Sequence, residues 1–553
     1  VAHRYMATAG APFATIEPMP FHASKSPDSF RIVVQGGSSA AGYPYGRWGG
    51  LAGMLEDRLE ATFPDREIEV VTTAMAAVNS YTLADLAEEI VAIEPDAVLI
   101  YAGHNEYIGT MGVGSGLTST SSQAEAQLLL KLRRIRLFQL IEWGMAKARV
   151  VAMMFGDSRN KFCARAASGA EIAYGSDIYR AGIDQFEANL DRLLARYAVA
   201  GIAVYIGTLV SNEKGLAPFA GSPDETIDRV DWNALIKQQR TSREAGDFTA
   251  ARGAGEQLIK LDPLAADAWF ALGQLERAAD RPSAARTAFA RARDLDRLRV
   301  RAPGAFEASI RRLAERHGAT VVEVEESFHD SAPDGMIGAE LMLEHVHPNA
   351  RGYFLLADAF YEALRSDAVI GDWSSAPTRD DALADMPLTE IDRLLGRYIV
   401  DELVSGRPFT DPPREFVLPP PGNEIERLAH QLRAGVIEWL EGLEALLQLR
   451  REQGRTADAA RVSRQIARAL PMEHAPNLTA GLLLVQLGRH ARARLYLERA
   501  LRAAPDDVPT WAALVEADLA LGDEMSAAEH LARLQQLAPE HPLVLGRSAS
   551  DPN

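Results

Sequence analysis

The chain has 553 residues, of which 47% are hydrophobic and 24% charged, a composition typical of a globular protein with two or three domains. Its formal net charge of -18, with no strongly basic domain, argues against nucleic-acid binding. A single cysteine, Cys163, excludes an internal disulfide and a cysteine-rich metal site, and no run of about 18 apolar residues predicts an integral membrane segment.

The first residues contain several prolines and no regular hydrophobic period, so we expect an extended lead-in over 1–30. The β-branched run at 32–34 predicts a buried strand, which stops at the stretch GGSSAAG. Glycines permit a tight turn and a close approach of a ligand, and the two serines place hydroxyl groups at the carboxyl end of the strand. Ligands bind at that end of the strands in open α/β sheets, so this turn is a candidate site.

Strands and helices alternate through the next part of the chain. Apolar spacing predicts helices over 48–63 and 81–93, and buried runs predict strands over 67–71 and 97–101. This order predicts a parallel sheet with right-handed crossovers, and therefore a three-layer α/β/α sandwich of the flavodoxin-like kind. Later elements of this domain are expected at 184–197 (helix), 202–210 (strand), 320–324 (strand) and 352–364 (helix).

Four short blocks of the chain resemble, in order, the blocks of the SGNH (GDSL-type) serine hydrolases. They are GGSSAAG around Ser38, the stretch around Ala77, Gly103-His104-Asn105-Glu106, and Glu344-His345-Val346-His347. The resemblance covers residues 31–365. It implies a nucleophile at Ser38, a base at His347 and a triad acid at Glu344. It also implies three oxyanion donors, namely the amides of Ser38 and Ala77 and the side chain of Asn105.

Simple chemistry supports the same roles. A serine hydroxyl is a weak nucleophile unless a base removes its proton, and histidine titrates in the required range. A carboxylate fixes the tautomer of that histidine, and Glu344 lies only three residues before His347. Preorganised donors typically stabilise an oxyanion by about 3–4 kcal/mol each. Neighbouring candidates for substrate contact are Gly37, His104 and Asn212, the last because it follows a predicted strand at the same sheet edge.

Two positions depart from the family pattern. Ala77 stands where that family usually has glycine, and we expect its amide to donate provided that its φ is negative. Glu344 replaces an aspartate, which leaves the more distant Asp330 as an alternative acid. Ser39 competes with Ser38 as the hydroxyl and His345 with His347 as the base. Cys163 is not expected to be a nucleophile, because no histidine lies near it in sequence.

Residues 127–154 interleave apolar with basic side chains. This pattern fits an amphipathic helix on a membrane surface, a lid over the serine site, or an ordinary helix at the sheet edge, and the three interpretations stay open.

A 34-residue period indicates tetratricopeptide repeats in two places. It relates Ala251 to Ala285 and Asp262 to Asp296, which predicts about one and a half units inserted at about 235–300. Beyond that insertion, Arg299 and Arg301 either reach an anionic group of a substrate or form a solvated helix end. The same period recurs over 426–545. There it is followed by three ladders, each a set of identical residues spaced 34 apart: Gly454, Gly488 and Gly522; Ala459, Ala493 and Ala527; Pro471, Pro505 and Pro539.

Residues 366–425 are rich in proline and predict a linker with one helix near 388–403. The sequence therefore predicts an α/β domain with helical repeats both inserted and appended. Such repeats present a concave surface, which favours a protein partner or self-association.

The predicted activity is that of a serine esterase acting on a small-molecule or glycan acyl ester, with no metal or organic cofactor. The rivals are a carbohydrate O-acyltransferase using the same residues and a degenerate hydrolase that acts as an interaction scaffold. Relatives with such repeats resemble envelope-associated bacterial proteins, which favours a periplasmic or envelope location, while a cytoplasmic one stays open. The chain begins with Val1 rather than Met, as expected if an upstream segment has been removed.

Overall fold

The computed structural model describes residues 19–115, 123–141 and 171–548. At its centre lies a sheet of five parallel strands in the order β2-β1-β3-β4-β5. The strands are β1 (Phe30–Gly36), β2 (Ile68–Thr72), β3 (Ala97–Tyr101), β4 (Ala203–Gly207) and β5 (Thr320–Val322). Both β1 and β3 are buried along their whole length, as their nearly continuous apolar sequences require in a sheet covered on two faces.

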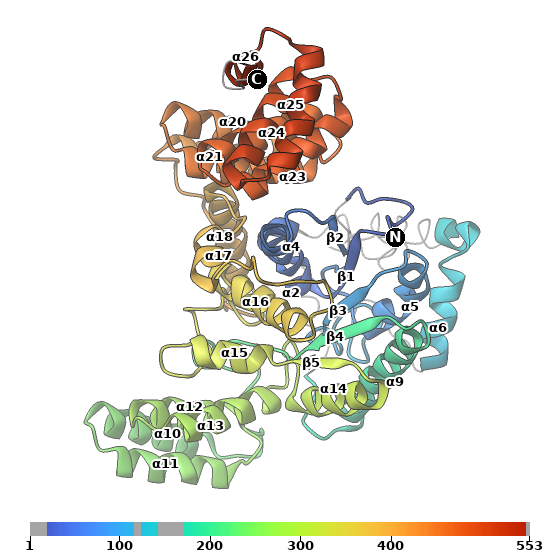
Figure 1. Cartoon of the computed structure of the whole chain (residues 1–553). Coiled ribbons are helices and arrows are strands. Elements are labelled where there is room, and N and C mark those ends of the chain that lie inside the picture. Colours follow the sequence, from blue (N-terminus) through green and yellow to red (C-terminus); the bar gives the residue numbers. More distant parts are fainter. Residues whose placement is uncertain (1–18, 116–122, 142–170, 549–553) are drawn as a thin grey trace.

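Helices cover both faces of this sheet (Figure 1). On one side α4 (Leu51–Thr62) packs against α16 (Ala350–Ser366), and on the other α9 (Asp177–Val199) packs between α5 (Ser80–Val91) and α14 (Gly304–His317). The three-layer α/β/α prediction is therefore confirmed. Shorter helices of this α/β domain are α2 (Ser38–Ala41), α3 (Gly46–Gly49), α6 (Gln123–Leu132) and α15 (Val324–Ser331).

The helix expected over 127–154 is described only in part. Residues 123–132 form α6, a further short helix follows at 136–141, and the rest of the predicted helix lies outside the described residues, as does Cys163.

The insertion between β4 and β5 consists of two antiparallel helix pairs. They are α10 (Arg229–Glu244) with α11 (Phe248–Leu261), and α12 (Ala266–Ala278) with α13 (Pro282–Leu295). The turn inside each pair contains a residue with positive φ, Gly246 at 78° and Asp280 at 56°. The 34-residue offset between these two residues therefore reflects one turn geometry used twice.

The C-terminal repeats form a second stack of helices: α20 (Trp439–Glu452), α21 (Thr456–Ala469), α22 (His474–Gln486), α23 (His490–Ala503), α24 (Val508–Leu521), α25 (Glu524–Leu537) and α26 (Pro542–Ser548). Gly454, Gly488 and Gly522 each occupy the turn inside a helix pair, with φ between 67° and 73°. The glycine ladder thus marks positions where a side chain would be strained. The alanine ladder marks fully buried positions in α21, α23 and α25.

The segment 366–425, expected to be a linker, contains helices that pack on the α/β domain. It includes α17 (Arg379–Ala384) and α18 (Glu390–Ser405), and α19 (Glu424–Arg433) begins at its end. Four apolar residues of this segment join the main hydrophobic core, namely Ile370, Trp373, Met386 and Leu388. We call 366–422 the connecting segment from here on.

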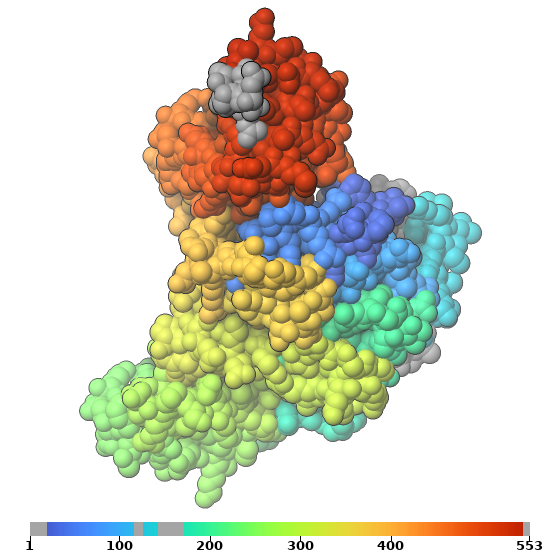
Figure 2. Space-filling model, viewed as in Figure 1, coloured from blue at the N-terminus to red at the C-terminus, as the bar shows by residue number. Residues whose placement is uncertain are grey.

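The C-terminal repeats sit directly on the α/β domain, whereas the inserted helices project from the opposite end (Figure 2). Arginines of α21 and α23 reach carboxylates of α4: Arg468 Nε donates to Glu60 Oε2 at 2.9 Å, and Arg499 Nη1 lies 3.0 Å from Glu60 Oε1. Burial alone would raise the pKa of Glu60, but these guanidinium groups lower it to about 2. The junction is thus an ion-pair network removed from water.

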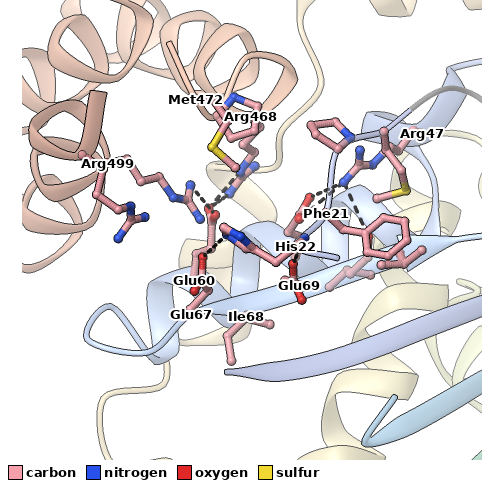
Figure 3. A pocket seen from close by; sticks show the side chains of 17 residues that line it. Phe21, His22, Arg47, Glu60, Glu67, Ile68, Glu69, Arg468, Met472 and Arg499 are labelled. Atoms are coloured by element: carbon pink, nitrogen blue, oxygen red, sulfur yellow. Dashed lines mark hydrogen bonds and ion pairs between the residues drawn. The ribbon is translucent and has the colours of Figure 1, made fainter. Parts of the chain in front are cut away.

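A small cavity of about 70 Å³ lies at this junction, beneath Arg468, Arg499 and Met472 of the repeats (Figure 3). Its other walls come from α4, β2 and the residues before β1. None of the residues predicted to be catalytic lines it, and its volume suits a few water molecules rather than a substrate.

Candidate active site

Ser38 is separated from the end of β1 by Gly37 alone and is the first residue of α2. The strand can turn here because of Gly36, since a Cβ on that residue would lie 2.1 Å from the carbonyl oxygen of Tyr101. The amide of Ser38 occupies the first position of a helix, where no carbonyl of the same helix is available to accept its hydrogen. Both the hydroxyl and this amide are therefore available at the carboxyl end of β1.

The structure brings Ser38, His347 and Glu344 together from widely separated parts of the chain. Ser38 Oγ lies 2.7 Å from His347 Nε2, and the opposite ring nitrogen, Nδ1, contacts Glu344 Oε1. Glu344 is 3% exposed. Its carboxylate also accepts the amide of His347 at 3.1 Å, so the longer side chain folds back onto its own loop. The alternative acid, Asp330, is exposed at the end of α15.

Ser39 has a different place from its neighbour. Its hydroxyl donates to the carbonyl oxygen of Val346 at 3.0 Å, and the side chain is buried. This bond joins the turn after β1 to the loop that carries His347. Of the two serines, only Ser38 is in contact with a histidine.

The two histidines of this loop also differ. Burial lowers the pKa of His347 to about 3, so its ring is neutral at pH 7. Burial also lowers the pKa of His345, whose ring lies at 89° to that of His347 with 5.9 Å between their centroids. His345 Nδ1 contacts the other carboxylate oxygen of Glu344, Oε2.

Ala77 and Asn105 flank Ser38 from the ends of β2 and β3. Asn105 Nδ2 lies 3.1 Å from where a Cβ on Gly37 would be, so the glycine gives this amide room beside the serine turn. No residue in the described parts of the chain accepts a hydrogen bond from the Asn105 side chain or from the Ala77 amide.

The negative φ on which donation by the Ala77 amide was made to depend is not found, yet this amide has no acceptor among the described residues. The φ of Ala77 is 61°, in the left-handed region where glycine is favoured. The turn is held there because the carbonyl of Ala77 accepts the amide of Thr110 at 3.0 Å, which fixes the peptide plane. The same geometry gives a physical reason for a glycine at this position.

Glu106 holds the Asn105 loop in place. Its buried carboxylate accepts the hydroxyl of Ser80 at 2.6 Å, the amide of Ser80 at 3.1 Å and the side chain of Gln185. Burial raises the pKa of this carboxyl. The sequence pattern assigns Glu106 no role of its own, because a buried carboxylate that holds the start of another helix has no local sequence signal.

Two of the candidate substrate contacts, His104 and Asn212, are buried. His104 Nδ1 accepts the amide of Ala302 at 3.2 Å, and burial lowers the pKa of His104 to about 3. Asn212 is 4% exposed. Its side-chain Oδ1 accepts the backbone amide of Gly215, and its backbone amide donates to the carbonyl of His345. Asn212 therefore supports the histidine loop and has little surface left for a substrate.

Arg299 and Arg301 are neither substrate contacts nor a solvated helix end. Both are buried. Arg299 Nε donates to the carbonyl of Ile172 at 3.0 Å, and Arg301 Nη2 to Asp296 Oδ2 at 2.9 Å. Arg301 Nη1 also donates to the carbonyl of Asn212 at 3.2 Å. Both expectations are wrong because these guanidinium groups join segments inside the fold that are far apart in sequence.

Three aromatic residues beside the triad were not predicted. The ring of Tyr43 lies 4.6 Å from that of His347. Phe219, in the loop after β4, and Phe409, in the connecting segment, both lie against the ring of His345, at 5.9 and 5.4 Å. Phe409 lies in a proline-rich stretch with no periodic pattern, so nothing in the sequence pointed to it.

Within the described residues, one group of side chains could hold a metal ion: Glu213, Glu325 and His329. His329 Nδ1 donates to the carbonyl of Gly335 at 2.9 Å, and its Nε2 lies 3.4 Å from Glu213 Oε1. Arg293 already brings a positive charge, with Nη1 at 3.5 Å from Glu325 Oε1. The triad residues do not belong to this group.

No helix in the described part of the chain has the length and apolar character needed to cross a bilayer.

A family model of the tetratricopeptide repeat matches residues 240–300 and 444–508, which confirms the repeats at both places. A search of the curated proteins finds no similar sequence.

Among solved structures, the chain is similar to an acetyl xylan esterase, AlAXEase, with 13% identity over 61% of this chain and 100% of that one, at a TM-score of 0.29. It is also similar to TesA, with 12% identity over 61% and 98% of the two chains and a TM-score of 0.27. A third is Pseudomonas aeruginosa pilF, with 14% identity over 58% and 98% and a TM-score of 0.18.

Proposed function

We propose that the chain is a serine hydrolase of the SGNH type that cleaves carboxylic esters by acyl transfer. The observation that carries this proposal is the 2.7 Å contact between Ser38 Oγ and the neutral ring of His347, whose other nitrogen contacts Glu344. That geometry suits a hydroxyl activated by a base whose tautomer is fixed by a carboxylate.

In the proposed mechanism, His347 takes the proton of Ser38 while the serine oxygen attacks the ester carbonyl. The developing oxyanion is met by the amides of Ser38 and Ala77 and the side chain of Asn105, none of which is engaged elsewhere in the described structure. His347 then passes its proton to the leaving alcohol. Water, activated by the same histidine, releases the acid from Ser38.

Glu344 orients His347 and stabilises its charged form during the reaction. Its carboxylate oxygens are held by three amides of the loop, those of His345, Val346 and His347, so the charge has a fixed position. This arrangement explains how glutamate serves where an aspartate is usual.

The first test compares Ser38→Ala with Ser39→Ala. Turnover of p-nitrophenyl acetate and labelling by a fluorophosphonate probe are expected in the parent chain. Ser38→Ala should lower turnover by at least about 10⁴-fold and abolish labelling. Ser39→Ala, which removes the hydrogen bond to Val346 but no reacting atom, should still be labelled. Labelling that survives in Ser38→Ala would overturn the proposal.

A second test addresses the acid and the oxyanion donor. Glu344→Gln should lower kcat by about 10⁴-fold, since the amide favours the wrong histidine tautomer. Asn105→Ala should lower kcat by about 10²- to 10³-fold with little change in KM, because its donor acts on the oxyanion. Parent-like kcat in either variant would contradict the assigned role.

We further infer that the C-terminal repeats bind a protein. Helices α21 and α23 face α4, so the helices that alternate with them, α20, α22 and α24, keep one face away from this junction. Large apolar residues are exposed on these helices, among them Leu482, Leu519 and Leu521. Light scattering of the purified chain would separate self-association from binding to another protein.

A further inference from the structure

The segment from α6 to residue 141 exposes large apolar side chains instead of burying them. Residues 136–141 are helical, and three of their side chains, spaced three and four positions apart, share one face: Leu137, Leu140 and Ile141. Such a face normally packs on the core, yet here the exposed fractions are 65%, 60% and 51%. Leu128 and Ile135, just before this helix, are 56% and 52% exposed. Five large apolar residues of this segment are therefore in contact with solvent.

The inner side of the same segment is fixed to the α/β domain. Leu130 of α6 is buried and joins the main hydrophobic core. Arg134 Nη2 donates to Asp85 Oδ1 of α5 at 3.0 Å. Gln139 Nε2 donates to the carbonyl of Arg133 at 2.6 Å, which joins the two helical stretches. These contacts hold one side of the segment against the domain and leave the apolar face outward.

Basic side chains lie among the exposed apolar ones. Residues 123–141 contain four basic residues and one acidic residue, Glu125, which gives a formal net charge of +3 in a chain whose net charge is -18. Lys131 and Arg136 are exposed, and no carboxylate in the described part of the chain forms an ion pair with either. An apolar face flanked by unpaired cations complements a partner that is both apolar and anionic.

The segment also lies where a broad partner can reach it. Helix α6 is at the outer edge of the α/β domain, on the side away from both the C-terminal repeats and the inserted helices (Figure 1). The space-filling view shows the same segment at the margin of the molecule (Figure 2). A flat surface can approach from this side, because both stacks of helices lie elsewhere.

We propose that this segment binds the surface of an anionic lipid bilayer and lies in the plane of the interface. Leu137, Leu140 and Ile141 enter the boundary between headgroups and acyl chains, while Lys131 and Arg136 meet the lipid phosphates. Transfer of the apolar side chains out of water and attraction of the cations to the anionic surface both favour this binding. The inference goes beyond the proposed esterase function and does not depend on it.

Co-sedimentation of the full chain with lipid vesicles tests the proposal. The probes are vesicles of phosphatidylcholine alone and vesicles of an equal mixture of phosphatidylcholine and phosphatidylglycerol. The parent chain should bind the mixed vesicles more strongly than the neutral ones, and this binding should weaken as salt rises. Leu137→Ser combined with Leu140→Ser should lower the partition coefficient on mixed vesicles at least about tenfold. Leu137→Ser alone keeps the test usable if the double variant folds poorly.

Exchange of the basic residues measures the electrostatic part of the binding. Lys131→Gln combined with Arg136→Gln should lower the partition coefficient on mixed vesicles about tenfold. Binding to neutral vesicles should stay the same, because these lipids carry no net charge for the cations to meet. An unchanged partition coefficient on mixed vesicles would contradict the anionic character of the partner.

Val199 and Val230 provide the control for exposed apolar residues in general. They are 86% and 76% exposed and lie outside this segment. Val199→Ser combined with Val230→Ser should bind both kinds of vesicle as the parent chain does, because singly exposed apolar residues form no surface patch. A loss in this control equal to that of the Leu137 and Leu140 variant would overturn the assignment to the segment.

Two further results would overturn the proposal. One is that the folded parent chain binds neither kind of vesicle, or binds them no better than the variant with Leu137→Ser and Leu140→Ser. The other is a dimer, seen by light scattering without vesicles, that the same two substitutions dissociate, since the apolar face would then belong to a second copy of the chain. Turnover of p-nitrophenyl acetate in solution that depends on Ser38 tests the esterase separately, so either proposal can fail without the other.

Discussion

The φ angle of Ala77 shows which backbone conformation the candidate site requires at this position. With φ at 61° it occupies a conformation that costs an L-residue roughly 1–2 kcal/mol and costs glycine none. The turn nevertheless keeps this angle, with its amide pointing to no acceptor in the described structure. Strain retained in such a place is typical of a functional position.

We expect Ala77→Gly to be tolerated in both stability and activity. Relief of the strained φ should offset the extra chain entropy of glycine, so the free energy of unfolding should change by less than about 1 kcal/mol. Ala84→Gly, in the interior of α5, is the control and should cost about 1 kcal/mol. Thermal unfolding and ester turnover measure the two effects. A tenfold loss of kcat in Ala77→Gly would show that the methyl group matters.

The proposed role of His347 predicts the pH dependence of the reaction. The base must be neutral, so kcat/KM falls as the pH drops through the pKa of His347 in the free enzyme. Because burial lowers that pKa from 6.5, activity should stay level from pH 8 to below pH 6.5 before it declines. Rates on p-nitrophenyl acetate in buffers of constant ionic strength check this. A midpoint at pH 7 or above would contradict the neutral, buried base.

At the scale of the element, α4 has two partners of different kinds. One face joins α16 over the sheet, and the other carries Asp57 and Glu60 toward the arginines of α21 and α23. Carboxylates buried in this way are stable only because guanidinium groups compensate their desolvation. The helix thus connects the serine turn, which it follows closely in sequence, to the C-terminal repeats.

Removing one member of this network should destabilise the whole. Arg468→Met leaves Glu60 and Asp57 short of a buried partner and should cost about 3–5 kcal/mol in the free energy of unfolding. Arg502→Met, which removes an exposed arginine of α23, should change it by less than about 0.5 kcal/mol. Denaturant unfolding followed by circular dichroism compares them. Equal stability of the two variants would mean that the junction contributes little.

At the scale of the whole molecule, the repeats and the α/β domain are joined by non-covalent contacts as well as by the covalent chain. Besides the Glu60 network, Arg492 Nη1 lies 3.1 Å from Asp385 of the connecting segment, and Trp439 Nε1 donates to Asp392 at 3.0 Å. The ring of Trp439 also stacks over that of Trp48 at 6.4 Å. These contacts lie outside the exposed stretch Pro419–Gly422.

We therefore expect the molecule to stay together when its chain is cut. A specific protease site placed in the exposed run 419–422 should be cleaved, yet both fragments should co-elute in size-exclusion chromatography at physiological salt. The same cut combined with Arg468→Met and Arg492→Met serves as the control and should release the repeats. Separate elution of the fragments without those substitutions would show that the covalent connection alone holds the domains.

The sequence by itself determined the local and periodic features of this protein. Buried β-branched runs gave the strands, the 34-residue ladders gave the helix pairs, and the short blocks placed Ser38, Asn105 and His347 at one sheet edge. Such features depend on neighbours in sequence or on the fact that parallel strands end at a common edge, so they can be predicted from the sequence alone.

Tertiary structure alone decided the contacts between distant segments. It separated Ser38 from Ser39 by the bond of Ser39 to Val346, gave Glu344 rather than Asp330 the contact to His347, and set Ala77 at a positive φ. It also buried Arg299 and Arg301, folded the expected linker onto the core, and brought Phe409 to the histidine loop. Each of these outcomes depends on contacts between groups that are far apart in sequence and that shield one another from water. No local pattern in the sequence specifies such contacts.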